Sequence, residues 1–151
     1  MAEAARPGAA RFTVVTLGVS DMRRSIAFYE ALGFERTMKA TGEEVAFFET
    51  GATALAIYPW SKLAAEAGLP AGSIAPGFRG VTLAWNCNSR GEVDAALAHA
   101  LATGGKPIKP AQVTDYGGYC GYFADPDGHL WEVVVAPGIE VTEDGRVKLP
   151  D

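Results

Sequence analysis

The chain is 151 residues long, with 48% hydrophobic and 21% charged residues and a formal net charge of −5. That length and composition suit one compact domain with a buried core. The negative charge and the lack of a Lys/Arg cluster argue against nucleic acid as a partner. No apolar run approaches the roughly 20 residues that cross a bilayer. We therefore expect a cytoplasmic protein that binds neither nucleic acid nor a membrane.

The N-terminal residues and the cysteines give no sign of secretion. Residues 1–10 are rich in Ala and Pro and lack the basic and apolar regions of a signal peptide, so we expect a disordered tail. Cys87 and Cys120 have neither a CxxC spacing nor the density of a disulfide framework. Reduced thiols in a packed interior are the better interpretation.

The first predicted unit covers residues 11–60 and has the order βαβββ. A strand over 11–19 leads to Ser20 or Asp21, either of which can cap a helix. The helix is predicted from four apolar residues at helical spacing: Met22, Ile26, Tyr29 and Leu32. Three short strands follow, over 36–40, 44–49 and 53–58.

A connector rich in Gly and Pro, residues 61–78, leads to a second unit over residues 79–137. Its start repeats the first unit, because Val81-Thr82-Leu83 follows Val15-Thr16-Leu17 by 66 positions. The same order of elements is then expected: a strand over 79–86, a helix capped by Ser89 and Glu92, and strands at 108–109, 119–124 and 129–135. Residues 138–151 form a C-terminal tail that could make a small hairpin.

A tight turn is predicted between the last two strands of the second unit. In Asp125-Pro126-Asp127-Gly128, proline presets the first turn angle and glycine takes the left-handed position. Two tandem βαβββ units predict a single α+β domain over residues 11–137.

Two stretches, residues 17–34 and 121–133, resemble the vicinal oxygen chelate superfamily, which includes glyoxalases, bleomycin resistance proteins and extradiol dioxygenases. The resemblance implies two modules whose curved mixed sheets surround a central cavity, with the helices outside. It also implies a homodimer. It does not identify a reaction, because one scaffold can host many functions.

Metal-dependent members of that superfamily place His or Glu at four strand positions facing the cavity. By resemblance these positions are Val14, Ala56, Gly80 and Glu132, and only Glu132 can coordinate a metal. His129 lies on the opposite face of its predicted strand from Glu132, and His99 lies off the apolar stripe of its helix. We therefore predict no metal ligands and no cofactor, although a divalent metal remains the alternative.

Strand alternation divides the predicted strands into a core face and a cavity face. The core face carries Leu17, Val19, Ile57, Leu83, Trp85, Trp131 and Val133. The predicted cavity lining is Val14, Thr16, Ala56, Tyr58, Gly80, Thr82 and Ala84, with Tyr116 and Tyr119 at the mouth. Gly18 also lies on the cavity side, and Trp60 is interpreted as connector packing rather than a lid.

Glu132 is the one ionisable group on the predicted cavity face. A carboxylate in an apolar cavity would suit a general base or a contact to a cationic or hydrogen-bond-donating ligand. The alternative is that Glu132 bonds to a neighbouring tyrosine and stabilises the sheet. Both interpretations stay open at this point.

The sequence predicts a protein that binds a small organic molecule between its two modules without a metal. Whether it is an enzyme stays open. One alternative is a metal-dependent lyase, isomerase or dioxygenase of the same superfamily. Another is an antibiotic-sequestering resistance protein, as the bleomycin resistance proteins are.

Overall fold

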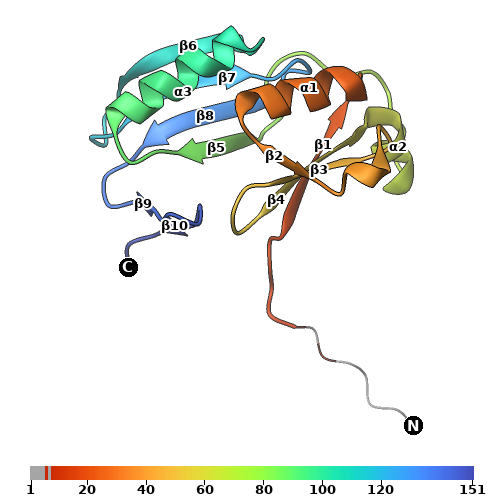
Figure 1. Cartoon of the computed structure of the whole chain (residues 1–151), viewed down its shortest axis with the longest axis horizontal. Coiled ribbons are helices and arrows are strands. Elements are labelled where there is room, and N and C mark those ends of the chain that lie inside the picture. The colour runs from red at the N-terminus through yellow and green to blue at the C-terminus, as the bar shows by residue number, and fades with distance from the viewer. Residues whose placement is uncertain (1–5, 7) are drawn as a thin grey trace.

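The computed structural model of the chain describes residue 6 and residues 8–151, so the predicted tail of residues 1–10 lies partly outside the described residues. The described residues form two four-stranded mixed sheets, one small hairpin and three α-helices (Figure 1). None of the helices in this range is long and apolar enough to cross a membrane.

The first module forms one sheet in the order β1-β4-β3-β2. Its elements are β1 (Val14–Val19), α1 (Met22–Leu32), β2 (Glu35–Thr37), a short 3-10 helix (Lys39–Thr41), β3 (Ala46–Glu49) and β4 (Ala54–Pro59). Strands β1 and β4 are parallel, whereas β3 is antiparallel to both of its neighbours. Helix α2 (Trp60–Glu66) follows β4 directly.

The second module repeats this order as β5-β8-β7-β6. Its elements are β5 (Thr82–Asn86), α3 (Arg90–Ala102), β6 (Lys106–Val113), β7 (Tyr119–Ala124) and β8 (Leu130–Val135). Again the first and last strands pair in parallel. The identical strand order confirms the predicted α+β fold of two βαβββ modules. Beyond it, β9 (Glu140–Val141) and β10 (Val147–Lys148) pair as an antiparallel hairpin.

The spacing of the two modules differs from the repeat seen in the sequence. Strand β1 begins at Val14 and β5 begins at Thr82, 68 positions later. Val14 pairs with Ala54, the first residue of β4. In the same way, Thr82 pairs with Leu130, the first residue of β8. The register therefore makes Thr82, and not Gly80, the counterpart of Val14. The error of two residues leaves the face of each side chain unchanged, because side chains alternate with a period of two.

Strand β6 is longer than the two residues predicted for it. Pro107 and Pro110 interrupt the strand signal, since proline cannot donate a hydrogen bond to a neighbouring strand. The structure accommodates both on an edge strand whose pairing with β7 is irregular on either side of Lys109.

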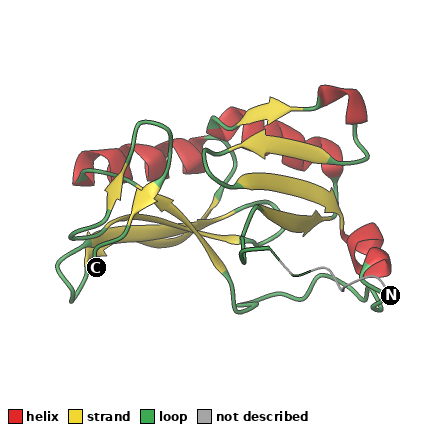
Figure 2. Cartoon of the chain, turned by 90° about the horizontal axis from the view of Figure 1, so that it is seen from below, coloured by secondary structure: helices red, strands yellow, loops and turns green. Residues whose placement is uncertain are grey.

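One hydrophobic core lies between the sheets and the layer formed by α1 and α3. All seven residues predicted for the core face either belong to this core or pack against it: Leu17, Val19, Ile57, Leu83, Trp85, Trp131 and Val133. Seen from below, the strands lie in front of the helical layer (Figure 2). The opposite face of each sheet, turned away from α1 and α3, is called the open face below.

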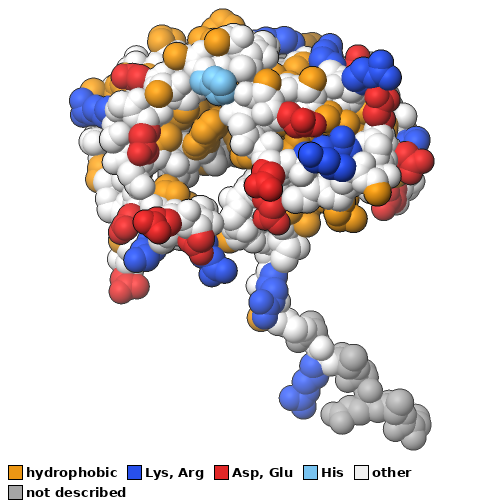
Figure 3. Space-filling view, in the orientation of Figure 1, with side chains coloured by type: hydrophobic (Ala, Val, Ile, Leu, Met, Phe, Trp, Pro, Cys, Tyr) orange, Lys and Arg blue, Asp and Glu red, His pale blue; other side chains and the backbone are white. Residues whose placement is uncertain are grey.

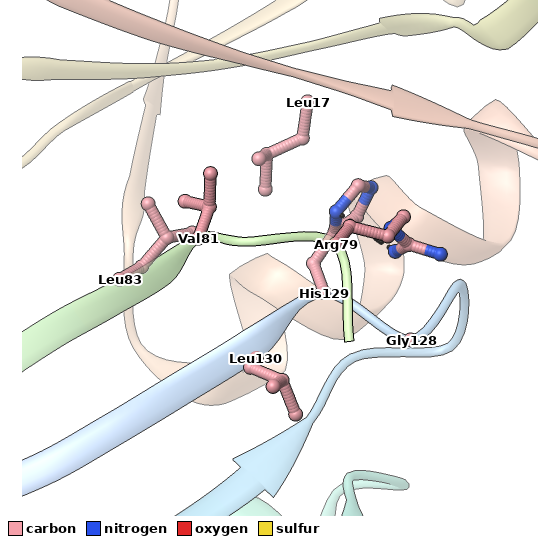
Figure 4. Close-up of a pocket in the computed structure, with 7 residues that line it drawn as sticks. All are labelled: Leu17, Arg79, Val81, Leu83, Gly128, His129 and Leu130. Atoms are coloured by element: carbon pink, nitrogen blue, oxygen red, sulfur yellow. Dashed lines mark hydrogen bonds between the residues drawn. The ribbon is translucent and has the colours of Figure 1, made fainter. Parts of the chain in front are cut away.

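The modules meet where Leu17 of β1 lies beside Val81 and Leu83 at the start of β5 (Figure 4). His129 bridges the same junction, with Nε2 2.7 Å from the Gly18 carbonyl and Nδ1 3.1 Å from Arg79. A carbonyl only accepts hydrogen bonds, so Nε2 donates and Nδ1 accepts from the guanidinium. His129 thus serves as a structural link between the two sheets.

Candidate functional site

The open face of the second sheet carries a row of side chains that crosses all four strands. Ala84 pairs with Glu132, Glu132 with Tyr122, and Tyr122 with Lys109. Paired residues in a sheet project to the same face. The row therefore runs from a small residue through a carboxylate and a phenol to an ammonium.

A pocket of about 400 Å³ lies over this row. It is lined by Lys109, Gln112, Val113, Thr114, Asp115, Tyr116, Cys120, Tyr122 and Glu132. All of these residues come from β6, β7, β8 and the β6–β7 turn. Its volume is in the range of pockets that hold small organic molecules.

Glu132 and Tyr122 form a hydrogen-bonded pair at the floor of this pocket. The Tyr122 hydroxyl donates to Glu132 Oε2 at 2.6 Å. That bond, together with burial and the negative charge of Glu132, raises the pKa of Tyr122 well above its usual value. Tyr122 is thus a neutral donor at physiological pH, as an ordinary tyrosine is, and the shift extends this to more alkaline pH. Glu132 keeps a second oxygen that can accept from a ligand.

Tyr116 can lie in the pocket wall because residue 118, which its ring contacts, is a glycine. A Cβ on Gly118 would stand 2.6 Å from Tyr116 Cε2 and 2.8 Å from the carbonyl oxygen of Val135. The turn that carries Tyr116 is held by Thr114, whose side-chain oxygen accepts from the Gly118 backbone N–H at 2.8 Å. The tight turn therefore places the Tyr116 ring against Gly118, directly before the first residue of β7.

Cys120 lies between the two tyrosines as a buried, protonated thiol. Burial raises its pKa first and the charge of Glu132 adds to this, while Lys109 and a hydrogen bond from Tyr116 oppose the shift. A thiol needs a lowered pKa to act as a nucleophile. Cys120 is therefore part of the pocket wall and not its reactive group.

The residues predicted from the first sheet lie away from this pocket. Val14 and Thr16 are exposed on the open face of the first sheet, Tyr58 is half-buried and Ala56 is buried. None of these four side chains is among those that line the pocket over Glu132. The structure therefore does not bring the two predicted halves of the site together around Glu132.

Part of the room predicted on the first sheet is filled by Trp60, the first residue of α2. A Cβ on Gly18 would stand 2.8 Å from Trp60 Cε3, so the indole occupies the space that this small residue leaves. Trp60 Nε1 donates to the Ala71 carbonyl at 2.9 Å, which holds the ring against the connector. Trp60 therefore packs as predicted.

The residues predicted from the second sheet divide into two groups. Thr82 and Ala84 are exposed in β5, and Gly80 precedes the strand. Tyr116 lies in the pocket wall with Glu132. The space-filling view shows an opening between the C-terminal hairpin and the rest of the molecule (Figure 3).

Tyr119 differs from its predicted place at the mouth of the pocket. Its ring packs against the core, and its hydroxyl donates to Asp94 of α3 at 2.6 Å. Alternation along β7 explains this, because Tyr119 lies on the opposite face of the strand from Cys120 and Tyr122.

The residues at the four implied ligand positions do not fit a divalent metal. Val14, Ala56 and Gly80 have no donor atoms in their side chains, and Thr82, the true counterpart of Val14, supplies only a hydroxyl. Glu132 is the single carboxylate, and one of its oxygens already accepts from Tyr122. Across residues 8–151, the side chains of His, Cys, Asp and Glu form no group of three or more suited to a metal.

Of the nine residues that line the pocket, only Tyr116 and Glu132 were predicted from the sequence to belong to the site. Lys109 and Gln112 were hidden because the prolines of β6 obscured its strand pattern. Tyr122 was not named among the predicted site residues, but one of the two interpretations of Glu132 was a bond to a neighbouring tyrosine, and the structure shows this bond with Tyr122 as the tyrosine. Period-two alternation from Cys120 to Tyr122, on the strand that pairs with β8, was the signal that could have joined Tyr122 to Glu132.

The fold and the signature stretches together assign the family. The family model described as Glyoxalase/Bleomycin resistance protein/Dioxygenase superfamily matches residues 11–133. The chain belongs to this superfamily. No curated protein matches the sequence.

Solved structures agree with this assignment. A glyoxalase-related enzyme from Fulvimarina pelagi is 31% identical, with a TM-score of 0.83, and the match covers 93% of this chain and 99% of the other. A glyoxalase/bleomycin resistance protein/dioxygenase from Nocardioides is 27% identical over 90% of this chain and 88% of its own, with a TM-score of 0.70.

A lactoylglutathione lyase from Agrobacterium tumefaciens shares the fold at 22% identity. Its TM-score is 0.65, and the match covers 85% of this chain and 95% of the other. At that identity the similarity concerns the fold and not the reaction.

Proposed function

We propose that the protein binds a small organic molecule in the pocket on the open face of the second sheet, without a metal held by the protein. The observation that carries this proposal is the Glu132–Tyr122 pair at the floor of a 400 Å³ pocket. The pair presents a carboxylate oxygen and a phenol oxygen from one rigid pair of strands. A few polar groups fixed in a concave pocket are the usual way to orient a small ligand.

The side chains argue for binding through Glu132 as a hydrogen-bond acceptor. Tyr122 fixes one carboxylate oxygen, so a ligand donor would meet the other without a change of rotamer. A hydrogen bond to a charged group contributes about 1.5–3 kcal/mol when desolvated. Because Glu132 is half-buried, we expect the lower end of that range, about tenfold in affinity.

A fragment screen followed by NMR tests this proposal. Fragments that bind should shift the backbone amides of Cys120 and Tyr122, and Glu132→Gln should weaken the best of them about tenfold. Glu35→Gln, which changes an exposed carboxylate on β2, is the matched control and should leave the affinity unchanged. Chelator treatment should have no effect on binding. The proposal fails if no fragment moves the pocket amides, or if binding disappears with the chelator.

A further inference from the structure

Three charged side chains line the pocket, Lys109, Asp115 and Glu132. Asp115 lies in the β6–β7 turn, whereas Lys109 and Glu132 belong to the row that crosses the sheet. Within that row the two opposite charges do not neutralise each other. Lys109 and Glu132 are separated by Tyr122, which pairs with both of them in register. Neighbouring strands lie about 4.8 Å apart, so the two backbones are roughly 10 Å apart. The ion pairs formed by the described residues include neither Lys109 nor Glu132.

Lys109 is paired with Tyr122 and so projects from the same side of the sheet, although it also lines a second cavity beside α3. Lys109 is one of the residues that line the pocket, and its positive charge acts on the Cys120 thiol in the pocket wall. Glu132 acts on the same thiol with the opposite sign. Along the row, the pocket therefore runs from a positive group on the edge strand β6 to a negative group on β8, and the Asp115 carboxylate adds a second negative group at the β6–β7 turn.

The surface between the two ends suits an unsaturated spacer. The rings of Tyr116 and Tyr122 lie in the pocket, with the thiol of Cys120 beside them. Aromatic side chains favour contact with planar, apolar groups. A ligand with a polar group at each end and a flat apolar middle would match charge and surface together.

We propose that the pocket selects a dipolar amino-carboxylate, whose carboxylate contacts Lys109 and whose ammonium contacts Glu132. This inference rests on the proposed function, since it specifies the ligand class of the same pocket. The second oxygen of Glu132 accepts from the ammonium while Tyr122 holds the first. Lys109 supplies a flexible point charge for the carboxylate.

Three matched compounds test the inference: 4-(aminomethyl)benzoate, 4-methylbenzoate and 4-methylbenzylamine. Their affinities are read from the amide shifts of Cys120 and Tyr122 in NMR titrations. The compound with both charges should bind about tenfold more tightly than either compound with one.

Two variants test the role of each charged residue. Lys109→Gln should weaken the binding of the two compounds that carry a carboxylate about tenfold and leave that of 4-methylbenzylamine unchanged. Glu132→Gln should weaken both amines and spare 4-methylbenzoate. Lys62→Gln, an exposed lysine on α2, should change none of them.

The outcomes separate this inference from the proposed function. The inference fails if the singly charged compounds bind as tightly as the doubly charged one, or if Lys109→Gln weakens all three equally. In both cases the shifts at Cys120 and Tyr122 would still support a ligand in this pocket. If the three compounds leave these amides unmoved while neutral fragments move them, the inference alone fails. If nothing moves them, the proposed function fails as well.

Discussion

At the scale of single residues, Tyr122 links the stability of the second sheet to pH. Its pKa is raised from 10.0, chiefly because its hydroxyl donates to Glu132. A folded state that holds a proton more tightly than the unfolded chain is stabilised at every pH below the unfolded pKa. That contribution is lost as the pH rises above 10 toward the folded pKa.

We expect Tyr122→Phe to lower the free energy of unfolding at pH 7 by about 0.5–1 kcal/mol, since the bond is half exposed to solvent. The difference between wild type and variant should shrink as the pH is raised above 10. Urea unfolding at pH 7, 9 and 10.5 measures both effects. Tyr29 also has a raised pKa, but it is present in both proteins and cancels in the difference. If the difference in unfolding free energy between wild type and Tyr122→Phe were the same at all three pH values, Tyr122 would not be the source of the pH dependence.

Gly18 shows how a missing side chain positions a neighbour. A Cβ at this position would stand 2.8 Å from Trp60 Cε3 and 3.3 Å from Trp60 Cα. Gly18→Ala should therefore destabilise the protein by about 1–3 kcal/mol, as overpacking does elsewhere.

Gly91→Ala in α3 is the matched control, because its Cβ would meet only Ser89 Oγ, at 3.8 Å. It should be neutral or stabilising by up to about 1 kcal/mol. Thermal unfolding of the two variants measures the difference in their stability. Equal effects would show that Trp60 moves aside for the new Cβ at little cost.

At the scale of elements, α1 is joined to the β7–β8 turn by a buried network. The Tyr29 hydroxyl donates to Asp125 Oδ2 at 2.7 Å and accepts from Trp131 Nε1 at 3.2 Å. Asp125 is fully buried, and its other oxygen accepts from the backbone N–H groups of Asp127 and His129. The carboxylate therefore fixes both the turn and the helix of the other module.

We expect Tyr29→Phe to lower the free energy of unfolding by about 2–3 kcal/mol. The substitution leaves a buried carboxylate oxygen and the Trp131 indole without their partner, and unsatisfied buried groups carry the full cost of desolvation. Tyr58→Phe is the matched control, because within residues 8–151 its hydroxyl has no hydrogen-bond partner, and it should change stability by less than about 0.5 kcal/mol. Chemical unfolding followed by tryptophan fluorescence measures both. A small effect at Tyr29 would mean that water replaces the hydroxyl.

The elements of both modules were largely predictable, and their pairing less so. Apolar periodicity and turn residues located the helices and most strands, because these signals are local. The offset between the modules was predicted two residues short, because the repeated tripeptide Val-Thr-Leu was taken to mark equivalent positions in the two modules. Register is set by pairing with β4 and β8. The pocket was predicted only in part for the same reason. Lys109 and Glu132 line one pocket because β6 pairs with β7 and β7 pairs with β8, and this pairing is not a local signal in the sequence.

At the scale of the whole molecule, the C-terminal hairpin contacts both modules. The Asn88 side chain donates to the Val141 carbonyl at 2.9 Å and accepts from the Val141 N–H at 3.0 Å. At the other end of the hairpin, the carbonyl oxygen of Asp144 lies 2.6 Å from where a Cβ of Gly51 would stand. Gly51 belongs to the β3–β4 turn and has a φ of 104°, which disfavours any side chain there. The hairpin thus joins the first module to the second.

We expect Asn88→Ala to release this hairpin while leaving the two sheets folded. The variant loses two hydrogen bonds that imitate strand pairing, so amide hydrogen exchange over residues 140–148 should rise about fivefold to tenfold, corresponding to about 1–1.4 kcal/mol of local stability. Asn88→Asp keeps the acceptor and removes the donor, and it should give an intermediate rate. Exchange over the core strands β4 and β8 should not change, because the core between the sheets and helices does not depend on the hairpin. If exchange rises equally in those strands, the hairpin unfolds together with the core and not as a separate unit.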